Sequence, residues 1–141
     1  LGGSHGFGFD SKILQFLSLE ISKLTAVGHS VGLVLGGGNL VRGSGFAELS
    51  DDRVVGDHMG MLATIMNALA VQSSLERHGV YTRVMSAISV DQICEPYIRR
   101  RAVRHLEKKR VCIFAAGTFV LACIEGFLAH GIFPANTYVF S

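Results

Sequence analysis

The sequence predicts an α/β fold in which helices cover a largely parallel sheet. Three short, mostly apolar runs suit buried strands, and three longer segments with helical character alternate with them. The predicted strands are Val31–Leu35, Thr82–Ala87 and Val111–Ala116. Because right-handed crossovers join such alternating elements, we expect helices on both faces of the sheet.

The first predicted helix begins near Ser11, where the Asp10 side chain can cap it, and ends at Gly28. Its apolar positions recur at helical spacing: Ile13, Leu14, Leu17, Ile21 and Leu24. The second predicted helix runs from Val54 to His78, with an inner side of Met59, Leu62, Ile65, Met66 and Leu69. The third, Ile98–Lys109, carries basic residues that are typical of a solvated face.

The pattern changes after the last predicted strand. From Thr118 to Ser141 the only charged residue is Glu125. A hydrophobic helix over Phe119–Ala129 would be shorter than the roughly 20 residues that span a bilayer, so we expect no membrane partner. The first residues lack the basic and apolar segments of a secretory leader, so we expect a cytoplasmic protein.

Composition narrows the class of protein. With 141 residues, of which 49% are hydrophobic and 17% charged, the chain suits one globular domain and not a disordered one. A net charge of +2 argues against nucleic acid as the main partner. Cys94, Cys112 and Cys123 form no CxxC pair, which favours free buried thiols over a disulfide or a metal site.

A run of three glycines, Gly36, Gly37 and Gly38, directly follows the first predicted strand. Glycine allows positive φ and close approach to a ligand, and successive N–H groups can converge on one anion. Arg42 follows, and its planar guanidinium can grip phosphate oxygens. No Lys-Ser or Lys-Thr follows the glycines, which excludes a P-loop. The alternative is a tight turn that needs glycine for steric reasons. The nearby Arg42 favours the phosphate-binding interpretation.

Two further residues could contact a ligand at the same edge of the sheet. Asp57, near the start of the second helix, can accept hydrogen bonds from sugar hydroxyls, although complementing the helix dipole is the commoner role of such a carboxylate. Thr118 follows the third strand, and open α/β sheets bind ligands beyond the carboxyl ends of strands. His58 has no second histidine four residues on, so we assign no metal ligand.

These motifs together resemble the bacterial UMP kinases. The matching segments, in family order, are residues 36–43, 52–64, 85–88 and 115–118, and the stretch Gly6–Asp10 is also similar. The resemblance implies the amino acid kinase fold, an αβα sandwich, and the synthesis of UDP from UMP and ATP with magnesium. It also implies a cytoplasmic homohexamer.

The resemblance assigns roles residue by residue. It implies that Gly37, Gly38 and Arg42 hold the UMP phosphate, that Asp57 meets the ribose and that Thr118 lies near the uracil. It links an N-terminal stretch and one arginine to allosteric activation by GTP, namely Gly3, Ser4, His5, Gly6, Phe7, Gly8 and Arg83.

The sequence departs from the family pattern at both ends. Family members begin with a strand carrying a lysine and a Ser-Gly motif, and they follow Gly-Thr with Asn-Pro-Phe-Phe, where this chain has Phe119-Val-Leu-Ala. We therefore expect an incomplete, UMP-binding half of the domain at residues 1–118 and a divergent apolar tail at 119–141, consistent with a fragment or a frameshift product. We assign no catalytic residue and expect little or no turnover, because phosphoryl transfer depends on positioning and charge neutralisation.

Three alternatives remain beside an active UMP kinase. The first is an inactive remnant that binds UMP or only oligomerises. The second is a relative of the same fold that phosphorylates a carboxylate or carbamate, which the Asp52–Thr64 block disfavours. The third is a Rossmann oxidoreductase, disfavoured because no acidic residue closes a second strand about 20 residues after a GxGxxG motif.

Overall fold

The computed structural model describes residues 1–41, 53–115, 131 and 136–140. Within these residues the chain forms one five-stranded sheet in the order β3-β2-β4-β1-β5. The strands are β1 (Ser30–Val34), β2 (Thr82–Ser86), β3 (Glu95–Pro96), β4 (Val111–Ala115) and β5 (Thr137–Phe140). Every neighbouring pair is parallel, which confirms the predicted parallel sheet.

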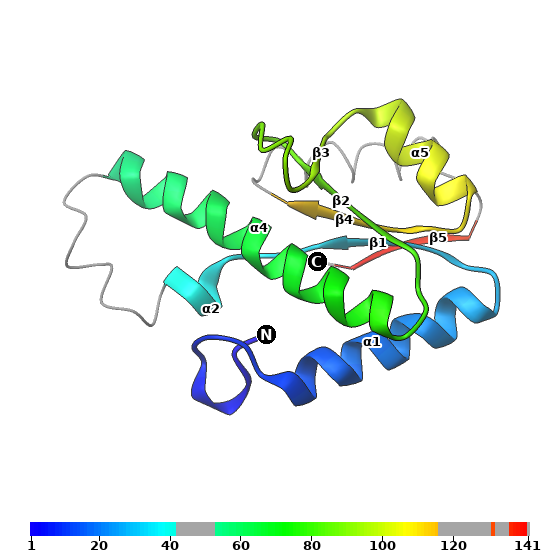
Figure 1. Ribbon diagram of the computed structural model, residues 1–141, viewed down its shortest axis with the longest axis horizontal. Coiled ribbons are helices and arrows are strands. Elements are labelled where there is room, and N and C mark those ends of the chain that lie inside the picture. Colours follow the sequence, from blue (N-terminus) through cyan, green and yellow to red (C-terminus); the bar gives the residue numbers. More distant parts are fainter. Residues whose placement is uncertain (42–52, 116–130, 132–135, 141) are drawn as a thin grey trace.

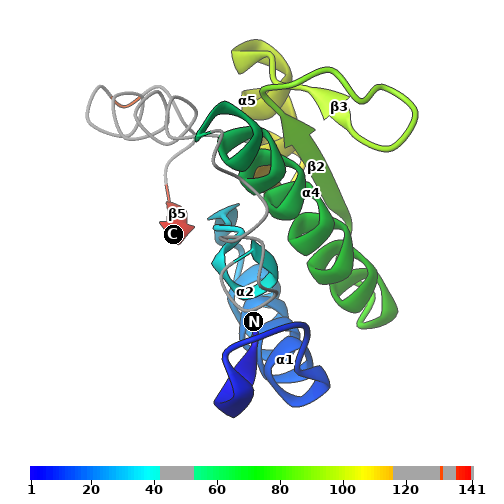
Figure 2. The same ribbon diagram turned by 90° about the vertical axis from the view of Figure 1, so that its left-hand side faces the viewer.

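The helices cover both faces of this sheet, as predicted (Figures 1 and 2). They are α1 (Ser11–Ala26), α2 (Gly38–Val41), α4 (Arg53–Arg77) and α5 (Arg99–Glu107), preceded by a short 3₁₀ helix, η1 (Gly3–His5). Side chains from α1 and α4 pack with Val31, Val111 and Ile113 in one core cluster. Residues from α5 pack with Cys112 and Phe114 in a second cluster. Alternate residues of β4 therefore pack against helices on opposite faces of the sheet, and the fold is a three-layer αβα sandwich.

The helix boundaries agree closely with the sequence signals. Asp10 caps α1 by accepting hydrogen bonds from the N–H groups of Lys12, at 2.8 Å, and Ile13. Gly28 and Gly79 follow α1 and α4 with φ of 90° and 75°, in the left-handed region that favours glycine after a helix. Ile98 and Lys108 flank α5 at its N-cap and C-cap positions, so this helix is slightly shorter than predicted.

The predicted inner side of α4 is partly wrong. Leu62 and Met66 are about half exposed, and only Ile65 of the five predicted residues is buried. The buried side consists of smaller and partly polar residues: Ala63, Ile65, Asn67, Ala68, Val71, Ser74 and Leu75. Small side chains let the helix approach its neighbours closely, so the larger apolar side chains point outward, and size rather than periodicity decides which side is buried.

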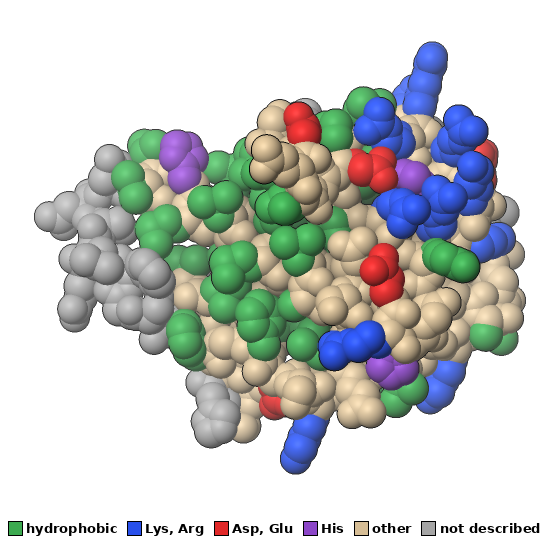
Figure 3. Space-filling view, in the orientation of Figure 1, with side chains coloured by type: hydrophobic (Ala, Val, Ile, Leu, Met, Phe, Trp, Pro, Cys, Tyr) green, Lys and Arg blue, Asp and Glu red, His purple; other side chains and the backbone are tan. Residues whose placement is uncertain are grey.

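Large apolar side chains therefore gather over the N-terminal half of α4, whereas Lys and Arg gather around α5 (Figure 3). By length and composition α4 could also cross a membrane, the one such helix among the described residues. A core helix passes the same test, and one side of α4 packs in the main core cluster.

Two strands were not predicted. β3 has only two residues, one of them a proline, and β5 lies in the stretch that was expected to be a divergent tail. β5 pairs along β1 from Ser30 to Leu33, so it forms one edge of the sheet. The predicted helix Phe119–Ala129 lies outside the described residues.

Candidate functional site

The glycine turn, residues 35–38, begins where β1 ends and leads directly into α2. None of its glycines has positive φ, so the expectation that glycine serves backbone conformation here is wrong. Close packing explains Gly37 instead: a Cβ on it would lie 2.8 Å from both the Gly60 carbonyl oxygen and the Ala63 Cβ. Gly37 therefore needs to be glycine for a steric reason, because a side chain at this position would collide with α4.

Two backbone N–H groups of the turn have no acceptor among the described residues. The Gly37 carbonyl oxygen accepts hydrogen bonds from the N–H groups of Leu40 and Val41, which starts α2. No described residue accepts a hydrogen bond from the N–H of Gly37 or of Gly38. Two successive N–H donors at the carboxyl end of a strand suit a phosphate oxygen.

Asp57 lies on the side of α4 that faces the glycine turn. It precedes Gly60 by three residues, and residues at that spacing share a helix face. Gly37 approaches Gly60, Ala63 and Thr64 of α4, and Asp57 stands about one turn of helix before Gly60. Asp57 is exposed and is the fifth residue of α4, beyond the first turn where the helix dipole acts most strongly.

The other two predicted UMP ligands, Arg42 and Thr118, lie outside the described residues. The elements that lead to them are placed: α2 ends at Val41, and β4 ends at Ala115 beside β1. The Ala115 carbonyl also accepts a hydrogen bond from Ala87 N–H at 3.2 Å, so the ends of β2 and β4 meet the same edge. That Arg42 and Thr118 face one crevice at this edge of the sheet stays a prediction.

The N-terminal loop, residues 2–8, is hydrogen-bonded to α2, directly after the glycine turn. Gly8 N–H donates to the Asn39 carbonyl at 2.8 Å, and the Asn39 side chain donates back to the Gly8 carbonyl at 2.8 Å. Gly3 has φ of 59°, and a Cβ on it would overlap the Asp10 side chain. The loop, Asp10, Lys12, Gly38 and Asn39 together line a cavity of about 740 Å³.

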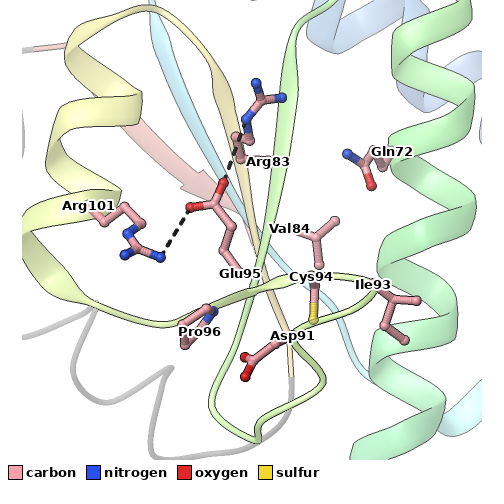
Figure 4. Close-up of a pocket in the computed structure, with 9 residues that line it drawn as sticks. All are labelled: Gln72, Arg83, Val84, Asp91, Ile93, Cys94, Glu95, Pro96 and Arg101. Carbon is pink, nitrogen blue, oxygen red and sulfur yellow. Dashed lines mark ion pairs between the residues drawn. The ribbon is translucent and has the colours of Figure 1, made fainter.

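Arg83, the other residue linked to GTP by resemblance, lies in a different cavity of about 550 Å³ (Figure 4). Its Nε is 3.7 Å from Glu95 Oε1, and Arg101 Nη1 is 3.7 Å from Glu95 Oε2. His105 Nε2 also lies 3.1 Å from Glu95 Oε2. No cavity found among the described residues is lined by both Arg83 and the N-terminal loop.

The two cysteines among the described residues, Cys94 and Cys112, are not paired with each other. Cys112 is buried and Cys94 half-buried, and both are free, as predicted; Cys123 lies outside the described residues. Burial raises the pKa of the Cys112 thiol from 9.0 to about 12 and also raises the pKa of Cys94. No three His, Cys, Asp or Glu side chains form a possible metal site within the described part of the chain.

Sequence reasoning missed Asn39 and Asn67, which connect the parts of this site. Asn67, fully buried on α4, donates to the Gly36 carbonyl at 2.6 Å and exchanges hydrogen bonds with the Asn39 side chain. A signal was present: Asn67 lies four residues from both Ala63 and Val71, which places a polar side chain on the buried face.

Comparisons with known proteins show which proteins this chain is similar to. The uridylate kinase of Methylococcus capsulatus is 60% identical over 118 residues, which are 84% of this chain and 49% of that protein. The uridylate kinase of Cereibacter sphaeroides is 55% identical over the same share of this chain and 48% of its own length. The chain thus spans about half the length of the curated relatives it matches.

Solved structures place the fold in the same group. The crystal structure of UMP kinase from Bacillus anthracis superposes with a TM-score of 0.75 at 38% identity, over 82% of this chain and 48% of that one. UMP kinase from Ureaplasma parvum gives a TM-score of 0.72 at 40% identity, over 78% and 48%. The sequence pattern of the amino acid kinase family matches residues 1–131, and the chain therefore belongs to that family.

Proposed function

We propose that this chain is the UMP-binding half of a uridylate kinase, which transfers the γ-phosphoryl group of ATP to UMP and releases UDP and ADP. One observation carries the proposal. The glycine turn leaves two N–H donors without acceptors among the described residues and packs against α4 at Gly60, about one turn of helix after Asp57. A phosphate at the turn and a ribose at Asp57 would fit that spacing.

Each residue has one task in this proposal. The N–H groups of Gly37 and Gly38 bind the phosphate oxygens of UMP, with Arg42 adding a charged hydrogen bond. Asp57 accepts hydrogen bonds from the ribose, and Thr118 lies near the uracil. The phosphate is thereby held for attack on ATP, which is the positioning that phosphoryl transfer requires.

Magnesium would accompany the phosphates of ATP. Within the described part of the chain no cluster of three carboxylate, histidine or cysteine side chains is available to hold a metal.

The remaining partners follow from the same proposal. We infer a cytoplasmic protein, as the family resemblance implies. We also infer that it self-associates, because exposed apolar side chains such as Phe16, Leu62 and Met66 suit contact with a second copy. GTP is the proposed effector of the N-terminal loop and of Arg83. Sedimentation of the wild-type chain beside a Leu62→Glu variant measures self-association, which the variant should weaken.

Calorimetry with UMP, CMP and uridine tests the binding half of the proposal, and release of ADP in the presence of UMP, ATP and magnesium tests the reaction. We expect UMP to bind more tightly than uridine, because the glycine turn contacts the phosphate. Binding without ADP release would instead support the inactive, UMP-binding alternative. Equal affinity for UMP and uridine would refute the assigned phosphate site.

A further inference from the structure

Asn67 is a polar side chain in the middle of the core. Its exposed fraction is 0%, and on α4 it stands among apolar residues such as Ala63 and Ala68. A buried amide that lost its partners would cost about 1–3 kcal/mol, so the partners of such a side chain define what it does. All of its hydrogen bonds lead to the glycine turn and α2, outside its own helix.

The first of these bonds orients a peptide group in the turn. Asn67 Nδ2 donates to the Gly36 carbonyl oxygen at 2.6 Å. The Gly36–Gly37 peptide bond is trans, like every peptide bond among the described residues, so the C=O of Gly36 and the N–H of Gly37 point in opposite directions. Holding the carbonyl toward Asn67 therefore aims the Gly37 N–H away from Asn67.

The second set of bonds extends the connection to the N-terminal loop. The side chains of Asn67 and Asn39 donate to each other, and Asn39 Nδ2 also donates to the Gly8 carbonyl. Gly8 N–H returns a bond of 2.8 Å to the Asn39 carbonyl. Figure 1 shows α2 lying between the N-terminal loop and α4, so the amide pair joins three segments that are distant in sequence.

We propose that Asn67 is a positioning residue for the nucleotide phosphate, which orients the Gly36–Gly37 peptide and, through Asn39, couples the glycine turn to the N-terminal loop. The inference rests on the proposed function, because it takes the phosphate to bind at the Gly37 N–H. Asn67 itself does not touch the nucleotide in this proposal. Its contribution is to orient the phosphate-binding peptide and to link the glycine turn to the N-terminal loop.

Two variants and a matched control test this role. Asn67→Ala removes the bond to Gly36 and both bonds to Asn39, and Asn67→Ser leaves a short hydroxyl that cannot reach both Gly36 and Asn39. Ser74→Ala is the control, because Ser74 is buried on the same helix and its hydroxyl bonds Ser18 and the Leu14 carbonyl, away from the glycine turn. Melting temperatures identify the variants that fold.

The readout is the ratio of UMP affinity to uridine affinity, measured by calorimetry. We expect both Asn67 variants to lower this ratio about tenfold, the loss of roughly one hydrogen bond to a charged group. Ser74→Ala should lower the melting temperature and leave the ratio unchanged. A ratio that either folded Asn67 variant leaves at the wild-type value would overturn the positioning role.

Hydrogen exchange of the free protein tests the coupling without any ligand. Asn67→Ala and Asn39→Ala should both speed exchange in residues 2–8, and Ser74→Ala should not. Unchanged exchange in this loop would overturn the coupling. Failure of the wild-type chain to bind UMP would overturn the proposed function and with it the positioning role, while the exchange result would still decide whether the three segments are coupled.

Discussion

Two cavities of this molecule could receive an anion, and they are built in different ways. The cavity beside the N-terminal loop is lined by four glycines among its ten residues, and its charged side chains are those of Lys12 and Asp10. The cavity at the end of β2 is lined by Arg83 and Arg101, whose guanidinium groups both lie beside Glu95. The cavity beside the N-terminal loop therefore offers backbone donors that carry little charge. The cavity at the end of β2 offers guanidinium groups whose charge Glu95 already partly neutralises.

This difference teaches that counting basic residues does not locate a phosphate site. Arginines that are paired with a carboxylate must give up that partner when an anion binds, so the net gain in binding free energy is small. Backbone N–H groups held in place by packing lose little entropy on binding and need no counterion. We therefore expect UMP to depend on the glycine turn and to be insensitive to the Arg83 cavity.

The largest effect is expected at Gly37. Gly37→Ala would place a Cβ 2.8 Å from Ala63 Cβ and from the Gly60 carbonyl oxygen, and the backbone atom cannot rotate away. The turn must shift, at a cost of about 1–3 kcal/mol in the free energy of unfolding. Loss of two phosphate bonds would weaken UMP binding about a hundredfold.

Gly36→Ala is the matched control for that variant. A Cβ on Gly36 meets nothing within 4 Å, and its φ is not positive, so both stability and UMP affinity should stay near the wild-type values. Calorimetry with UMP and thermal melting of the two variants give the comparison. If Gly36→Ala and Gly37→Ala weakened binding equally, packing on α4 would not be what holds the turn.

The sequence predicted the elements that depend on local signals. Asp10 marks the start of α1, Gly28 and Gly79 follow helices, and the β4 run is buried along its whole length. β5 was missed because its place depends on pairing with β1, more than 100 residues earlier in the chain. No local pattern contains that information.

The site shows the same division. The glycine turn and Asp57 could be proposed from residue types, because phosphate and sugar contacts need particular chemical groups. The Asn39–Asn67 pair could not be predicted, since it depends on how closely α2 and α4 approach. The positions of Leu62 and Met66 were predicted wrongly for a related reason: apolar periodicity marks a helix face and does not say which of two apolar faces meets the sheet.

The second prediction uses Cys112, which lies near the Arg83 cavity. Its pKa is raised to about 12, mainly by burial and also by Glu95, while Arg110 and Arg83 act in the opposite direction. Because the folded pKa exceeds the unfolded value, the neutral thiol stabilises the fold fully below pH 9. Stability should fall by up to about 1.4 kcal/mol per pH unit as pH rises from there toward 12.

Urea unfolding of the wild-type chain and of Cys112→Ala at several pH values measures the contribution of Cys112 to the free energy of unfolding. Other groups titrate in the same range, but they do so in both proteins, so the difference between the two isolates Cys112. The variant should be less stable at pH 8, and the gap should narrow as pH increases. A gap that is constant with pH would show that the thiol titrates alike in both states.

The third prediction concerns Glu95. Glu95→Gln removes the carboxylate charge that faces Arg83 and Arg101, so an anion should bind the cavity more tightly, by roughly two- to fivefold because these groups are partly exposed. GTP is the anion to titrate, at low and high salt, and the gain should shrink at high salt. UMP affinity should not change.

Glu20→Gln controls for the loss of an acidic group. Glu20 pairs with Lys23 on the surface of α1, and neither residue lines the Arg83 cavity. GTP affinity that rose equally in both variants would reflect net charge alone, and the cavity would then have no specific role.

The smallest effect is expected at Lys12, the cation of the other cavity. Its side chain is exposed and is in no ion pair with the residues described, so it should attract the nucleotide through a field that water and salt screen. Lys12→Met should weaken UMP binding about two- to threefold at low salt and less at high salt. Lys23→Met, on the same helix but paired with Glu20, should have no effect. A loss at Lys12 that matched the hundredfold loss at Gly37 would show that the cavity recognises phosphate by charge, against the distinction drawn between the two cavities.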